Sequence, residues 1–158
     1  MALRTFVKVG NVTNLTDARY CAGMGVDLLG FPAIENTANY MAPKTFQEIR
    51  GWITGPQIVA EVYGLTSASQ LDAVLENYRP DLIELSLSEW KLLGGHLSIP
   101  FILALSSGEE VPHFDTEPDY LLVPERAGHL EKIVPDYNVL VSVSVSYTHL
   151  TLPTKRIV

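Results

Sequence analysis

The sequence is poor in cysteine and in basic side chains, and it contains no long apolar run. Its 158 residues include a single cysteine, Cys21, so no disulfide can form within the chain. Lysine and arginine number 11 against 18 aspartate and glutamate residues, which gives a formal net charge of −7. No basic patch stands out, so nucleic acid and anionic membrane surfaces are not expected partners. No stretch approaches the roughly 20 apolar residues of a membrane-spanning helix.

Two further absences narrow the class of protein. The opening "MALRTFVKVG" has no apolar segment before a cleavage site, so we expect no signal peptide. Together with the single cysteine, this predicts a cytoplasmic protein. His96, His113 and His129 lie in linking segments without the spacing of metal ligands, so we expect neither a metal nor a cofactor. Cys21 falls on the apolar side of a predicted helix, which favours a small core residue over a reactive thiol.

Apolar runs typical of strands alternate with helical patterns along most of the chain. Apolar residues make up 47% and charged residues 18%, which indicates one ordered domain. Strands are predicted over 5–9, 26–31, 57–64, 81–87, 101–105, 119–123 and 138–143. Helices are predicted from a cap at Asn14 or Thr16 to Gly25, from Pro43 to about Trp52, and over 66–78. The segments between the last four strands are short and only weakly helical.

Near-continuous apolar strands that alternate with helices predict a parallel sheet covered on both faces. An open doubly wound sheet and a closed barrel both satisfy this pattern. No G-x-G-x-x-G follows the first strand, so dinucleotide binding has no support. The unit recurs roughly every 20–25 residues, and this regularity favours an α/β fold of the (β/α)8 TIM barrel type. Seven strands are one short of eight, so we predict an incomplete barrel that lacks the last βα units.

One stretch carries a resemblance to a known family. The segment "VKVGNVTNLTDARYCAGMGVDLLGF" resembles the opening of phosphoribosylanthranilate isomerase, which reads Lys-x-Cys-Gly-Ile-Thr, then Asp-Ala, then Gly-Ala-Asp-x-x-Gly-Phe. The positions that keep this frame are Lys8, Thr13, Asp17, Ala18, Gly25, Asp27, Gly30 and Phe31. The segment "NYMAP" (39–43) is similar to the family's Arg-Tyr-x-x-Pro, and "DLIELSL" (81–87) stands where the family has Val-Gln-Leu-His-Gly. The likeness covers roughly residues 5–125 and is strongest in the first 45.

The resemblance implies a (β/α)8 barrel isomerase of tryptophan biosynthesis, which performs an Amadori rearrangement of an aminoaldose to an aminoketose. In that family a cysteine ending the first strand is the general base and an aspartate ending the sixth is the general acid. Here Gly10 stands in place of the cysteine, and Val123 or Pro124 in place of the aspartate. General acid–base catalysis contributes about 10²–10⁴-fold in rate, so we predict that the family's activity is lost.

Three ionisable side chains are the predicted substitutes at the catalytic positions. Side chains two apart in a strand share a face, so Lys8 faces the interior if position 10 does, and Glu84 faces inward with Ser86. Glu61 lies in an otherwise apolar strand. Buried charges need partners, so we predict that Lys8 pairs with Glu84, with Glu61 nearby. This group is either an interior salt bridge or a replacement acid–base pair.

Three polar residues are predicted to line the barrel mouth and to bind substrate. Asn39 stands where the family has an arginine thought to hold the anthranilate carboxylate, and Ser86 stands for a histidine of the fourth strand. Asn11 follows the first strand, where it can hydrogen-bond a polar ligand. A small phosphorylated metabolite is the partner class that the resemblance implies.

The C-terminal stretch "VSYTHLTLPTKRIV" (145–158) differs from the rest of the chain. It resembles a translated sequencing adapter, so we predict a barrel domain over 1–143 and a non-native tail over 144–158. Barrels of this type commonly grip phosphate with glycine-rich loops after strands seven and eight, and no such loop follows here. We therefore expect the first and seventh strands to present open edges, the ring to stay unclosed, and a ribose phosphate to go ungripped.

Three functions remain open from the sequence. The first is a truncated, catalytically deficient relative of phosphoribosylanthranilate isomerase. The second is a non-catalytic barrel that binds a small metabolite or a protein partner. The third is another phosphate-binding barrel enzyme, such as one of the related tryptophan or thiamine pathways.

Overall fold

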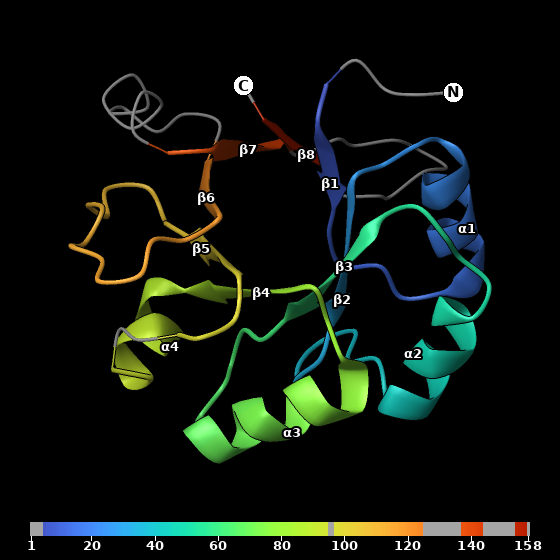
Figure 1. Cartoon of the computed structure of the whole chain (residues 1–158), viewed down its shortest axis with the longest axis horizontal. Coiled ribbons are helices and arrows are strands. Elements are labelled where there is room, and N and C mark those ends of the chain that lie inside the picture. Colours follow the sequence, from blue (N-terminus) through green and yellow to red (C-terminus); the bar gives the residue numbers. More distant parts are fainter. Residues whose placement is uncertain (1–4, 95–96, 125–136, 144–153, 158) are drawn as a thin grey trace.

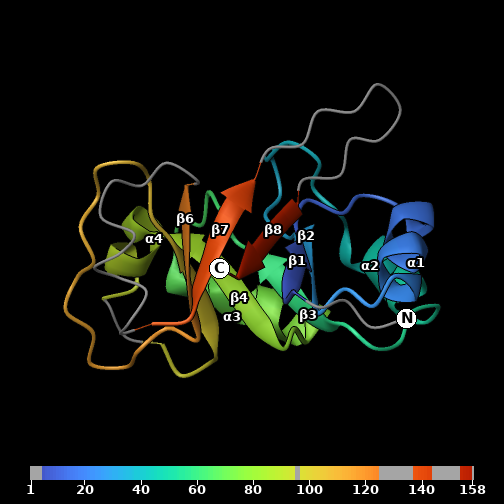
Figure 2. The same ribbon diagram turned by 90° about the horizontal axis from the view of Figure 1, so that it is seen from above.

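The strands of the chain form a closed ring in the computed structural model, which describes residues 5–94, 97–124, 137–143 and 154–157 (Figure 1; Figure 2). Seven strands run parallel, and their order around the ring follows their order in the sequence. The strands are β1 (Val7–Val9), β2 (Leu28–Pro32), β3 (Gln57–Glu61), β4 (Leu82–Ser86), β5 (Phe101–Ala104), β6 (Tyr120–Pro124), β7 (Val139–Val143) and β8 (Thr154–Ile157). The predicted TIM barrel type with about seven strands is confirmed.

Helices follow each of the first four strands and lie outside the ring (Figure 1). They are α1 (Leu15–Gly23), α2 (Pro43–Arg50), α3 (Ala68–Tyr78) and α4 (Leu87–Leu92). The segment 105–119, between β5 and β6, contains no helix, as its sequence indicated. The predicted strand over 81–87 ends one residue early, because Leu87 already begins α4.

Side-chain caps fix where the helices begin. The Asn14 side chain accepts a hydrogen bond from the Asp17 backbone N–H at 2.8 Å, and Ser67 Oγ accepts one from the Gln70 backbone N–H at 3.2 Å. Each bond satisfies a donor that a first helical turn would otherwise leave unpaired. Of the two predicted caps for α1, the structure therefore uses Asn14.

An outer core lies between the ring and the helices. The ring of Phe46 in α2 contacts the rings of Phe31 in β2 and Tyr78 in α3, with both centroid distances at 5.1 Å. The Tyr78 hydroxyl donates a hydrogen bond to the Met41 carbonyl. Cys21 is 2% exposed in this core, and burial with the nearby Asp17 charge raises its pKa to about 11. Its predicted role as a small core residue is confirmed.

An inner core fills the ring itself. Six apolar side chains, one from each of β2 to β7, pack together inside the barrel and are at most 6% exposed. They are Leu28, Val59, Leu82, Ile102, Leu122 and Leu140. Because strand side chains alternate, the residues two positions later face the same interior and lie one layer nearer the carboxyl ends. This plug supports the layer in which the candidate site is built.

The ring is closed by β8, which corrects the expectation of open edges. Strand β8 pairs antiparallel with both β1 and β7, so that position 156 is opposite Val7 on one side and Val141 on the other. The prediction of an open ring was wrong because it assigned no structure to 144–158. Residues 154–157 of that segment form the strand that closes the ring. A complete barrel of this class has eight parallel strands, so the antiparallel β8 is a departure from it. The non-native origin of 144–158 stays a prediction, and most of that tail lies outside the described residues.

Candidate active site

Three charged side chains from three strands meet inside the barrel. Lys8 of β1 places its Nζ 2.8 Å from Glu61 Oε2 of β3 and 2.8 Å from Glu84 Oε1 of β4. Lys8 and Glu84 are fully buried and Glu61 is 6% exposed. The predicted contact between Lys8 and Glu84 is therefore confirmed, and Glu61 contacts the same amine. We call these three side chains the ion triad.

The ion triad fits inside the barrel because the neighbouring residue of β2 is a glycine, Gly30. Gly30 of β2 lies beside it, and a Cβ atom placed there would come within 2.4 Å of Glu61 Oε2 and 2.8 Å of Lys8 Nζ. Real carbon atoms do not approach oxygen or nitrogen so closely. Glycine at position 30 is thus required by the packing of the two charges.

Two further donors bind the carboxylates of the triad. The backbone N–H of Asn11 donates to Glu61 Oε1 at 2.9 Å, and the Tyr63 hydroxyl donates to Glu84 Oε2 at 2.5 Å. Both oxygens of Glu61 and Glu84 Oε2 therefore accept hydrogen bonds, and Glu84 Oε1 lies in ion-pair contact with Lys8. One lysine faces two carboxylates, so the group carries a net charge of −1 when all three side chains are ionised.

The charges within the triad set the protonation of Lys8 and Tyr63. Burial alone would lower the pKa of Lys8, but the adjacent Glu61 and Glu84 carboxylates outweigh it and raise that pKa above 10.5. Burial, followed by the Glu84 charge, raises the pKa of Tyr63 well above 10.0. Both groups hold their protons at neutral pH. Lys8 therefore cannot accept a proton there, which removes it as a general base.

These raised pKa values predict that the folded protein loses stability at alkaline pH. A raised folded-state pKa contributes stability that is complete below the unfolded pKa and is lost as pH rises toward the folded one. For Tyr63 and Lys8 the loss starts near their ordinary values of 10.0 and 10.5. We expect the urea midpoint of unfolding to fall between pH 9 and pH 11.

The Lys8→Met/Glu61→Gln/Glu84→Gln variant supplies the control for this alkaline transition. It retains Tyr63, Tyr78 and Tyr120, whose pKa values are raised chiefly by burial, and removes only the part of the Tyr63 shift that the carboxylates cause. Its midpoint should therefore fall less than that of the parent. An equal fall in both proteins would show that the triad does not contribute.

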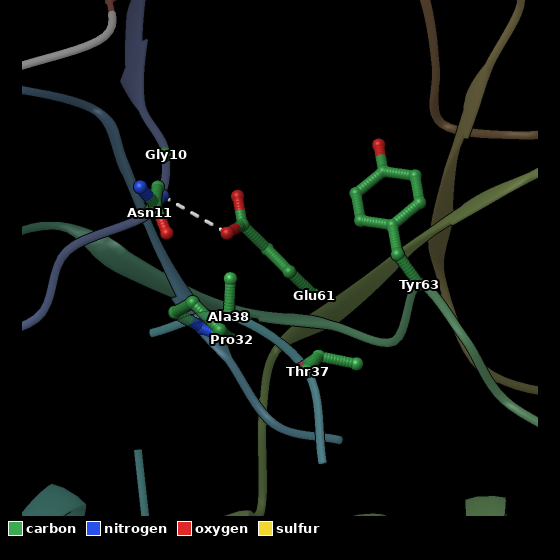
Figure 3. A pocket seen from close by; sticks show the side chains of 7 residues that line it. All are labelled: Gly10, Asn11, Pro32, Thr37, Ala38, Glu61 and Tyr63. Atoms are coloured by element: carbon green, nitrogen blue, oxygen red, sulfur yellow. Dashed lines mark hydrogen bonds between the residues drawn. The ribbon is translucent and has the colours of Figure 1, made fainter. Parts of the chain in front are cut away.

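A pocket of about 340 Å³ opens above the triad at the carboxyl ends of β1, β2 and β3 (Figure 3). Its lining comes from these strand ends and from the loops that follow them, and comprises Gly10, Asn11, Pro32, Thr37, Ala38, Glu61 and Tyr63. Figure 3 shows Glu61 between Asn11 and Tyr63, with its carboxylate turned toward Asn11. Glu61 is the one member of the triad that lines this pocket.

The other two predicted binding residues do not line this pocket. The Asn39 side-chain amide donates to Asn11 Oδ1 at 3.4 Å, and both asparagines adopt left-handed backbone, with φ of 63° and 56°. Asparagine tolerates that conformation better than most residues. Ser86 Oγ donates to Glu89 Oε1 at 2.7 Å at the start of α4. Asn39 thus supports Asn11, whereas Ser86 is engaged in a helix cap.

The structure also shows where the two positions lie that the resemblance assigns to the family's base and acid. Gly10 is buried and lines the pocket, so the first position has the expected location but no functional group. At the end of β6, Val123 is 1% exposed and packs in the outer core. Pro124 lies two positions after Leu122 of the inner core, so both residues are on the interior face of the strand. The residue that faces the mouth is therefore Pro124, and it has no ionisable group.

Two residues of the site were not predicted from the sequence. Tyr63 lies two positions after Glu61, so strand alternation could have placed it on the same face. Gly30 was noted only as one of the positions that keep the family frame, because its packing role depends on side chains from two other strands. Within the described part of the chain, no group of three or more His, Cys, Asp or Glu residues could hold a metal. No helix among those residues is both long and apolar enough to cross a membrane.

The solved structures that resemble the chain share one architecture. No protein-family model and no curated protein matches the chain. Among solved structures, phosphoribosylanthranilate isomerase from Thermus thermophilus superposes with a TM-score of 0.65 at 20% identity, over 85% of this chain and 74% of that one. The enzyme from Pyrococcus furiosus gives a TM-score of 0.62 at 13% identity, over 87% and 76%.

A third solved structure includes a ligand. It is a phosphoribosylanthranilate isomerase in complex with reduced 1-(o-carboxyphenylamino)-1-deoxyribulose 5-phosphate, with a TM-score of 0.62 at 18% identity over 85% of this chain and 73% of that one. Likeness at this level of identity establishes shared architecture. The chain therefore has the barrel fold of the phosphoribosylanthranilate isomerases. At the carboxyl ends of its strands it has the ion triad, and the first strand is followed by Gly10, which has no functional group.

Proposed function

We propose that the chain is a divergent relative of phosphoribosylanthranilate isomerase that binds a small phosphorylated metabolite at the barrel mouth without performing the Amadori rearrangement. The observation that carries this is the pair Gly10 and Pro124 at the two mouth positions that correspond to the family's base and acid. Neither residue can transfer a proton. Related barrels place their active sites at this same face, which supports the mouth as the binding region.

The ion triad does not replace the missing pair in this proposal. Lys8 and Glu84 are fully buried, so they cannot touch a ligand in the pocket. Glu61 reaches the pocket, but its two oxygens accept from Lys8 and from the Asn11 backbone. We assign the triad a structural and electrostatic role.

A turnover assay with phosphoribosylanthranilate tests the catalytic half of the proposal. The chain is expected to show no conversion above a protein-free control, because each missing group contributes about 10²–10⁴-fold. The Thermus thermophilus enzyme is the positive control. Turnover within about a hundredfold of that enzyme would contradict the proposal, because it would require an acid–base pair at this mouth.

Calorimetry with the reduced deoxyribulose phosphate named above tests the binding half. Saturable one-to-one binding, competed by inorganic phosphate, would support a mouth that takes phosphorylated ligands. Absence of binding at millimolar concentration would contradict it. The two halves are independent, since binding does not need the acid and base.

A further inference from the structure

A second pocket, of about 320 Å³, lies outside the ring between the neighbouring helices α1 and α2 (Figure 1; Figure 2). One wall is a single face of α2 and of the turn that follows it, because its residues recur at spacings of three and four. The residues that open α1 form the other wall. The lining comprises Thr13, Asn14, Leu15, Thr45, Glu48, Ile49 and Trp52. We call this pocket the helix groove, and its volume lies at the lower end of the range for ligand sites.

One end of the helix groove presents an exposed tryptophan that is held in place. Trp52 follows α2 and is 67% exposed, and its backbone N–H donates to the Ile49 carbonyl at 2.9 Å. The Arg19 guanidinium of α1 lies over the indole, 5.7 Å from the ring centroid. A cation over an aromatic face is attracted to it, so this contact orients the ring. Because most of the side chain is exposed, an accessible aromatic surface remains at the groove.

Polar groups of the helix groove are available to a ligand. Glu48 lies four positions before Trp52 in the same wall, so the carboxylate and the indole are neighbours. Within the described part of the chain, the Glu48 carboxylate and the hydroxyls of Thr13 and Thr45 take part in no hydrogen bond or ion pair. All three side chains are exposed, whereas Ile49 beside them is 4% exposed. The groove therefore combines an apolar floor with one carboxylate and two hydroxyls.

The two charged groups around Trp52 have opposite sign. A cationic ligand on the indole would lie near the Arg19 guanidinium, and an anionic ligand would lie near the Glu48 carboxylate. Since like charges repel, each of these groups disfavours one class of ionised ligand. A neutral molecule with an apolar face and adjacent hydroxyl groups meets both conditions. A pyranose ring is such a molecule, because its C–H groups can lie against an indole while its hydroxyls donate to a carboxylate.

We infer that the helix groove binds a neutral pyranose ring, with the C–H face of the sugar on Trp52 and adjacent hydroxyl groups on Glu48. Thr13 and Thr45 supply further hydrogen bonds from the two walls. The inference goes beyond the function proposed for the barrel mouth, and the two pockets share no lining residue among those that the structure describes. A single sugar ring in a shallow groove makes few contacts, so the dissociation constant is expected in the millimolar range.

Titration with methyl β-glucopyranoside, followed through the indole N–H signals by NMR, tests the inference. The chain has two tryptophans, Trp52 in the groove and Trp90, which is 7% exposed in the outer core. The Trp52 signal, assigned by its absence from the Trp52→Phe variant, is expected to shift saturably while the Trp90 signal stays in place. Cyclohexanol, which has a similar apolar ring but one hydroxyl, should bind about tenfold more weakly. Glucosamine and glucuronate, titrated at about pH 6 where both are ionised, should also bind more weakly than the glycoside.

Four variants, studied by ligand-observed NMR, assign the binding to the groove. Trp52→Ala should weaken the affinity for the glycoside about tenfold, because the stacking surface is removed. Glu48→Gln should weaken it about fivefold, because charge-assisted hydrogen bonds become neutral ones. Arg19→Gln should reduce the disadvantage of glucosamine, since the like charge is removed. Lys44→Met, at an exposed position outside the lining, should bind as the parent does. Circular dichroism checks that each variant is folded.

Several results would overturn the inference. The first is the absence of a saturable Trp52 shift at tens of millimolar glycoside. Cyclohexanol binding as tightly as the glycoside would indicate a purely apolar site, and tighter binding of glucosamine or glucuronate would indicate an ionic one. Unchanged affinity in Trp52→Ala would place the sugar elsewhere. Displacement of the glycoside by the reduced deoxyribulose phosphate would place it at the barrel mouth, whereas failure of that phosphate to bind would reject the proposed function and leave the groove unaffected.

Discussion

Replacing Lys8 by methionine is expected to lower the free energy of unfolding by about 3–5 kcal/mol. The substitution keeps the length of the side chain but removes the ammonium group that contacts both Glu61 and Glu84. Two carboxylates would then face each other in a site where one is 6% exposed and the other fully buried. Neither can turn to solvent, so the penalty is that of breaking a buried ion pair by removing one partner. Urea unfolding at pH 7, followed by circular dichroism, measures the change.

The triple variant with Glu61→Gln and Glu84→Gln is the companion experiment. It removes all three charges, so it should recover more than half of the stability lost in the single variant, because neutral groups carry no charge to desolvate. Lys44→Met, at an exposed lysine in the first turn of α2, should change stability by less than about 0.5 kcal/mol. A loss below about 1 kcal/mol for Lys8→Met would mean that the site is not dry and that the triad is not structural.

Replacing Gly30 by valine is expected to cost about 3 kcal/mol or more, although valine is the better strand former. A Cβ atom at this position would lie 2.4 Å from Glu61 Oε2 and 2.8 Å from Lys8 Nζ. The ends of flexible side chains can often move aside, but these two are bonded to each other and enclosed. Their displacement would break the ion triad, so overpacking and the loss of buried ion pairs add together.

Gly23→Ala provides the matched control for the effect at Gly30. Gly23 ends α1, and a Cβ atom there would meet nothing within 4 Å. Alanine should be neutral or stabilise by about 0.5–1 kcal/mol through its helix propensity. Thermal unfolding of both variants checks the contrast. If Gly30→Val unfolds at the same temperature as the parent, the close approach of the charges to β2 is incorrect.

Much of the fold was predictable because it depends on periodicity. The predicted strands over 26–31, 57–64, 81–87, 101–105 and 119–123 are each directly preceded by glycine or proline, and helical patterns separate the first four strands. Strand β8 was not predictable in the same way. Its four residues lack an apolar run, and their pairing is antiparallel, which breaks the repeat from which the barrel was inferred.

The candidate site was only partly predictable. Lys8 and Glu84 could be paired because buried charges require partners and because strand alternation turns both inward. The same alternation, applied from Glu61, would have found Tyr63. Gly30 could not be found, since its role is to leave space for side chains more than 20 and 30 residues away in sequence. Ser86 was predicted to face a ligand, but its hydroxyl is used by Glu89 at a helix start.

The separation between the inner core and the mouth has a consequence for engineering. The carboxyl ends of β4 to β7 present small, half-buried side chains, Ser86, Ala104, Pro124 and Ser142, which lie in register as two neighbouring pairs. The inner core that fills the ring consists of other residues, nearer the amino ends of the strands, and Ala104 packs against it. New reactive side chains can therefore be introduced at these four positions without replacing a residue of the inner core. The chain is thus a suitable scaffold for engineered catalysts.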